Sequence, residues 1–128
     1  MSRITVRVMV SVALVLGGIG IGTAGSSDAE SKGSEKYTTF CVPCHGPAGK
    51  GDGLAAASLN PKPRNFADGN YMNTRTDAQV MNVIKNGSAA EKLSPLMVGY
   101  GSMLNDQEIK DIVAFIRSLA VPKYQPKK

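Results

Sequence analysis

The sequence predicts an all-α fold, because helical periodicity recurs along the chain and no segment shows the sustained alternation of a β-strand. The clearest helical signal is an apolar stripe near the C-terminus, formed by Ile109, Ile112, Val113, Ile116 and Leu119. A second signal is a pair of helix-start patterns, Thr76 with Gln79 and Asn105 with Glu108. With 128 residues, 42% hydrophobic and 20% charged, the chain has the size and composition of one globular domain.

The first residues are typical of a secretory signal peptide. Arg3 and Arg7 precede an apolar run over residues 8–21, and small residues follow it. Such a run is shorter than the roughly 20 residues that a transmembrane helix needs, so we expect residues 1–29 to be removed, with cleavage at about residue 26 or 29. The alternative is an uncleaved N-terminal anchor.

The segments after the leader predict a short helix followed by loops. Residues 26–34 are small and polar and indicate a flexible approach to the domain. A helix is expected over residues 34–42, with Ser34 as its N-cap. The four glycines of residues 46–53 favour a loop, because glycine loses more backbone entropy in a helix than other residues do. Residues 54–59 can form one or two helical turns.

The second half of the chain contains the two best-marked helices. One is expected over residues 76–86, with Gly87 ending it. Serine, proline and glycine interrupt residues 87–104, which predicts a long loop. The last helix begins after Asn105 and is stopped by Pro122. Its apolar stripe must pack against another apolar surface.

One pentapeptide contains every cysteine and histidine of the chain. It reads Cys41-Val42-Pro43-Cys44-His45, the Cys-x-x-Cys-His pattern of covalent haem attachment. Two thiols at this spacing can each join one of the two vinyl groups of a haem, and the next residue then reaches the iron. We therefore expect one covalently attached haem c, with Cys41 and Cys44 as its attachment points and His45 as an iron ligand. A loop carbonyl is expected to accept from the other ring nitrogen of His45.

Three other readings of the pentapeptide are weaker. A thioredoxin-like redox pair would need a βαβ context, which the helical pattern does not offer. A structural zinc site needs four nitrogen or sulfur ligands, and Cys41, Cys44 and His45 supply three. A plain disulfide would leave His45 without a role.

The sixth iron ligand cannot be a second histidine from this chain, so it is methionine, water or vacant. The expected mature chain has four methionines. Met81 falls among apolar helix positions and fits core packing, and Met72 lies close after the haem motif. Met97 and Met103 lie in the long loop before the last helix, which can bring a thioether over the haem.

Over residues 33–119 the sequence resembles class I c-type cytochromes, particularly small bacterial periplasmic monohaem members and the haem domains of cytochrome oxidase c subunits. Gly33, Tyr37 and Phe115 match the residues at which the first and last helices of that family cross. Residues 44–53 resemble its glycine-rich turn, and residues 60–66 resemble a segment that lines the haem edge. The resemblance implies a cytochrome c-like fold of three to five short helices and loops around one haem, over residues 30–122, with a basic tail at 123–128.

The resemblance also selects one methionine. In the family the axial methionine is followed by an aromatic residue at the third position and leucine at the seventh, and Met97, Tyr100 and Leu104 match that frame. Met97 is therefore the implied axial ligand. Val98 stands where the family usually has proline, which removes one source of loop rigidity.

These features predict an electron carrier and not an enzyme: a monomeric periplasmic cytochrome that meets redox protein partners transiently. The formal net charge is +5 and the basic residues are dispersed without interleaved aromatics, which does not indicate nucleic-acid binding. Acidic partners could be steered by Lys50, Lys62, Arg64, Lys85 and Lys92. The alternatives are a permanent haem subunit of a larger oxidoreductase and, less well supported, a haem-based ligand sensor. No transmembrane span is expected after cleavage.

Overall fold

The computed structural model describes residues 25–125, so most of the predicted signal peptide lies outside the described residues. This part of the chain is helical and contains no strand, apart from one isolated bridge between Asp68 and Val121. Its α-helices are α1 (Gly25–Phe40), α2 (Val42–His45), α3 (Gly69–Met72), α4 (Asp77–Asn86) and α5 (Asp106–Leu119). Two 3₁₀ turns, η1 (Leu54–Ser58) and η2 (Ser88–Glu91), lie between them. The all-α prediction is confirmed.

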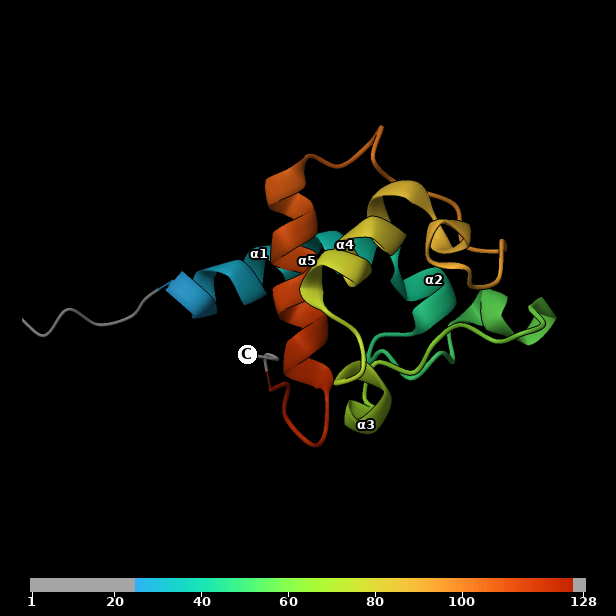
Figure 1. Cartoon of the computed structure of the whole chain (residues 1–128), viewed down its shortest axis with the longest axis horizontal. Helices are drawn as coiled ribbons and strands as arrows, with labels where there is room; N and C mark the ends of the chain where they lie inside the picture. The colour runs from blue at the N-terminus through green and yellow to red at the C-terminus, as the bar shows by residue number, and fades with distance from the viewer. Residues whose placement is uncertain (1–24, 126–128) are drawn as a thin grey trace, which may run out of the picture.

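The crossing of α1 and α5 organises the fold (Figure 1). The two backbones approach closely at Gly33, where an added Cβ would lie 1.9 Å from the carbonyl oxygen of Asp111. One helical turn further on, Tyr37 packs its ring against Phe115 of α5, with ring centroids 5.0 Å apart. Only glycine leaves room for this approach, so the sequence position of Gly33 fixes where the helices cross.

The core lies on the inner face of α5. Its fully buried large side chains are Tyr37, Ile109, Ile112 and Ile116. The surrounding buried residues come from α3, α4, α5 and the segments that flank these helices. The apolar stripe predicted for the last helix is therefore the face that packs inward. Among the described residues no helix is long and apolar enough to cross a bilayer.

The N-terminal part of the chain differs from the sequence prediction. Residues 26–34 are not a flexible approach but belong to α1, and Ser34 lies inside that helix instead of capping it. The carbonyl of Ser34 accepts from the hydroxyl of Thr38 one turn later. Packing against α5 holds the second half of α1 in place. Once a helix is formed, each further residue that joins it gains one hydrogen bond, so the helix can extend back through residues 26–34. Local composition therefore did not decide where α1 begins.

The two later helices begin as predicted. Thr76 and Gln79 form a complete capping box at the start of α4, and Asn105 and Glu108 form one at the start of α5. The loop expected over residues 87–104 contains η2, which the sequence pattern did not indicate. The short helix α3 was also missed.

A buried arginine ties the wall around α3 to α5. Arg117 is 7% exposed, and its guanidinium donates to the carbonyl oxygens of Met72 at 2.6 Å and Arg75 at 2.7 Å. It also pairs with Asp77 at 2.9 Å and lies over the ring of Tyr124, 3.7 Å from its centroid. These contacts fix the segment that links α3 to α4.

Candidate functional site

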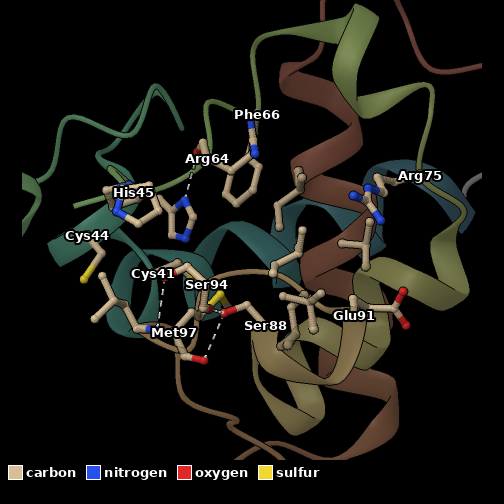
Figure 2. A pocket seen from close by; sticks show the side chains of 18 of the residues that line it. Cys41, Cys44, His45, Arg64, Phe66, Arg75, Ser88, Glu91, Ser94 and Met97 are labelled. Atoms are coloured by element: carbon tan, nitrogen blue, oxygen red, sulfur yellow. Dashed lines mark hydrogen bonds between the residues drawn. The ribbon is translucent and has the colours of Figure 1, made fainter. Parts of the chain in front are cut away.

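A cavity of about 430 Å³ opens beside α2 (Figure 2). Its walls come mainly from α2, from the segment before α3, from helices α3 and α4, and from η2 with the loop that follows it. Helices α1 and α5 contribute one side chain each. Most of the lining is apolar, including Phe40, Phe66, Val80, Ile84 and Ile116. This size and lining are typical of sites that enclose an apolar organic cofactor.

The histidine of the pentapeptide faces this cavity, and a hydrogen bond fixes which of its ring nitrogens carries the proton. His45 is 8% exposed, and its Nδ1 lies 3.0 Å from the carbonyl oxygen of Arg64. A carbonyl oxygen can only accept, so Nδ1 carries the proton and Nε2 keeps its lone pair. Phe66 stacks on the imidazole with centroids 4.3 Å apart and holds its plane. The loop carbonyl expected from the sequence is that of Arg64.

Burial also keeps this ring neutral. Removal from water lowers the pKa of His45 below its ordinary value and outweighs the hydrogen bond to Arg64, which acts in the opposite direction. A neutral imidazole is the form that binds a metal. His45 is thus prepared to act as a ligand through Nε2.

The two cysteines line the same cavity as free, half-buried thiols. Burial, together with the nearby Cys44, raises the pKa of Cys41 to about 12, so its thiol stays protonated at neutral pH. A redox pair of the thioredoxin kind depends on a lowered thiol pKa, so this environment argues against that alternative. Within residues 25–125 no group of three or more histidine, cysteine and acidic side chains is placed to hold a metal ion.

The structure separates the candidate methionines. Met97 is half-buried and lines the cavity together with Cys41, Cys44 and His45 (Figure 2). Met103 is 56% exposed and Met81 packs against the core, and neither lines the cavity. Met72 also borders the cavity but is 2% exposed within the core.

Two arginines lie at the cavity edge: Arg64, within the segment 60–66 expected to line the haem edge, and Arg75, which sequence reasoning did not assign to the site. The guanidinium of Arg64 lies 3.8 Å from the centroid of the Tyr71 ring, and the Nε of Arg75 donates to the Tyr71 hydroxyl at 3.2 Å. Both arginines line the cavity. No local sequence pattern marks Arg75, which meets Arg64 through the ring of Tyr71. Their positive charges suit the two carboxylates that a haem carries.

The residues present therefore fit a covalently held haem. The cavity offers apolar walls, two thiols, an imidazole with a free Nε2 and a thioether. It also offers two guanidinium groups at its edge. The family model described as Cytochrome c matches residues 30–120.

The chain belongs to the cytochrome c family. This confirms the resemblance seen in the sequence and the cytochrome c-like fold, and it implies covalently bound haem and haem-based electron transfer. No curated protein matches the sequence.

One solved structure with this cytochrome fold comes from Kuenenia stuttgartiensis. It is the reducing HAO-like protein complex Kustc0457/Kustc0458, and the alignment has a TM-score of 0.59 and 25% sequence identity. The match covers 76% of the present chain and 46% of that chain. The cytochrome described here thus spans just under half of the chain that it matches.

Proposed function

We propose that this protein is a periplasmic monohaem cytochrome c that carries single electrons between respiratory redox proteins. Cys41 and Cys44 hold the haem covalently, and His45 and Met97 are the axial ligands of its iron. The observation that supports this proposal most strongly is that one cavity is lined by all four side chains.

The bound haem supplies reversible one-electron exchange, and the chain determines how that exchange proceeds. The Arg64 carbonyl and the Phe66 ring hold His45 in one orientation and one tautomer. A thioether from Met97 in place of a second imidazole favours the reduced state and raises the potential. The apolar walls exclude water, so little has to rearrange when the charge changes.

Ligation by Met97 favours carriage of electrons over catalysis. With His45 and Met97 as ligands, the iron of a bound haem would have no open position for a substrate. The remaining wall residues near Met97 include no second histidine for acid–base chemistry, since the chain has one. We therefore assign the protein as an electron carrier and not an enzyme.

The site of action follows from the leader. Residues 1–29 form a signal peptide, residues 30–122 the cytochrome domain and residues 123–128 a basic tail. The secreted protein works as a monomer that meets its partners through small, short-lived interfaces and does not bind nucleic acid. Exposed basic residues support steering towards acidic partners, namely Lys50, Lys62, Arg64 and Lys92. Lys85 contributes less, because it pairs with Asp106 at 2.6 Å.

A second candidate function is a permanent haem subunit of a larger oxidoreductase. The similarity to one chain of an HAO-like protein complex favours it. The two candidates differ in what purifies with the protein from its native membrane and periplasmic fractions. A free carrier elutes at its own mass, and its reduction by partners slows steeply with added salt. A subunit elutes with a large partner.

The ligand assignment is tested by optical spectra of the protein matured with haem. The oxidised wild type should show a sulfur-to-iron charge-transfer band that Met97→Ala abolishes, whereas the control Met103→Ala keeps it. Absence of the band in the wild type, or its survival in Met97→Ala, would contradict ligation by Met97. Immediate binding of carbon monoxide to the reduced wild type would instead support the sensor alternative.

A further inference from the structure

The loop that carries Met97 is attached to the end of α4 through one buried serine. Ser88, the first residue of η2, is 6% exposed. Its backbone N–H donates to the carbonyl oxygen of Met97 at 3.1 Å. Its hydroxyl reaches the same carbonyl at 3.3 Å and is also within hydrogen-bonding reach of the carbonyl of Ser94 (Figure 2). The Ser88 N–H thus donates to Met97, and its single hydroxyl proton is shared between the carbonyls of Ser94 and Met97.

Further bonds hold the loop on the C-terminal side of Met97. The N–H of Tyr100 donates to the carbonyl of Ile84 at 2.8 Å, and that of Gly101 donates to Lys85 at 2.9 Å. On the N-terminal side, the N–H of Leu93 donates back to the carbonyl of Ser88 at 3.0 Å. Residues 94–99 lie between these fixed points. In this stretch, Ser88 of η2 donates hydrogen bonds to the backbone carbonyls of Ser94 and Met97.

The residue after Met97 does not itself stiffen the loop. Val98 is 64% exposed and, unlike proline, does not lock its own backbone dihedral. Removing the Ser88 hydroxyl would leave the partly buried carbonyls of Ser94 and Met97 with fewer donors, and a buried polar group without a partner is costly.

We propose that Ser88 is the positioning residue for Met97: its hydroxyl and its N–H clamp the ligand-bearing loop so that the thioether stays at the haem cavity. This inference rests on the proposed function, in which Met97 is the axial ligand. Loss of the hydroxyl removes part of the attachment, so the loop should open more often. The Ser88 N–H still donates to Met97, so the helices should remain folded. Loops held by few bonds open locally in this way, independently of global unfolding.

Competition by added imidazole measures the clamp, because imidazole takes the sixth position of the oxidised protein only when Met97 leaves. Ser88→Ala should keep the sulfur-to-iron band but bind imidazole about tenfold more tightly than the wild type. The matched control is Ser102→Ala, which removes an exposed hydroxyl from the same loop. Its imidazole affinity should match that of the wild type.

The outcomes separate this inference from the proposed function. Loss of the band in Met97→Ala together with unchanged imidazole affinity in Ser88→Ala would overturn the clamp and leave Met97 as the ligand. A wild type without the band, or a Met97→Ala variant that keeps it, would overturn the ligand assignment, and the clamp with it. An equal rise in affinity in Ser88→Ala and Ser102→Ala would reject any special role of Ser88.

A second measurement needs no substitution, and it tests the coupling between Ser88 and Met97 even if the Ser88→Ala protein cannot be produced in folded form. Amide hydrogen exchange of the wild type is followed by NMR with and without saturating imidazole. Displacing Met97 should speed exchange of the Ser88 amide by about tenfold or more, while buried amides of α5 such as that of Ile112 stay unchanged. Unchanged protection of the Ser88 amide would show that its bond to Met97 is not coupled to ligation.

Discussion

Replacing Gly33 with alanine is expected to destabilise the protein by about 2–3 kcal/mol, through the crossing of α1 and α5. The added methyl carbon would lie 1.9 Å from the carbonyl oxygen of Asp111 and 2.4 Å from its carbonyl carbon, whereas ordinary contacts measure 3.4–4 Å. The obstructing atoms belong to the backbone, so no side chain can rotate away. The two helices must therefore move apart by about 1.5 Å.

The expected loss of stability follows from the side chains that lose contact when α1 and α5 move apart. Tyr37 and Ile112 are buried beside the crossing, at 1% and 0% exposure, and Phe115 packs on Tyr37. Full burial of such a side chain contributes roughly 1.5–3 kcal/mol, and a gap of even about 1 Å removes up to half of the attraction across it. The better helix propensity of alanine returns at most about 1 kcal/mol.

Urea unfolding of the haem-loaded protein, followed by circular dichroism, measures this effect. Ser31→Ala is the matched control, because Ser31 is exposed in the same helix. Its free energy of unfolding should stay within about 0.5 kcal/mol of the wild type. If Gly33→Ala were as stable as Ser31→Ala, close backbone approach would not set the helix crossing, and the reasoning would be wrong.

Two further predictions concern the stability of the fold and not the iron ligands. The hydrogen bond from Lys36, with that from the Asn105 backbone, lowers the pKa of Glu108 below its ordinary value of 4.5. The unfolded chain therefore binds more protons near this pH, so the contribution of Glu108 to stability is complete above about pH 4.5 and is lost as the pH falls through the folded-state pKa. Glu108→Gln, which keeps a capping side chain, should show a shallower loss of unfolding free energy in acid, and an identical acid profile would contradict this. Arg117→Lys should lower stability by about 2 kcal/mol, because one ammonium cannot replace the planar guanidinium that reaches the carbonyls of Met72 and Arg75. An unchanged urea midpoint would show that those bonds contribute little.

The sequence correctly predicted the features that depend on residues three or four positions apart. The capping boxes at Thr76 and Asn105 are of this kind, since each cap and its partner lie within one helical turn. The pentapeptide is equally local, so its cysteines and His45 could be proposed as haem-binding residues before any fold was known, and that assignment stays a prediction. The beginning of α1 was predicted wrongly, because packing against α5 outweighed the small, polar composition of residues 26–34.

The sequence alone determined the helical class, the caps and the group of side chains able to hold a haem, because these depend on periodicity and short spacing. Tertiary structure decided which groups meet around the cavity. His45 finds the carbonyl of Arg64 across 19 positions, and Arg117 finds that of Met72 across 45. Backbone carbonyls leave no mark in a sequence, since every residue carries one. Only the packing of segments far apart in the sequence selects the carbonyl that orients the histidine and the carbonyls that Arg117 binds.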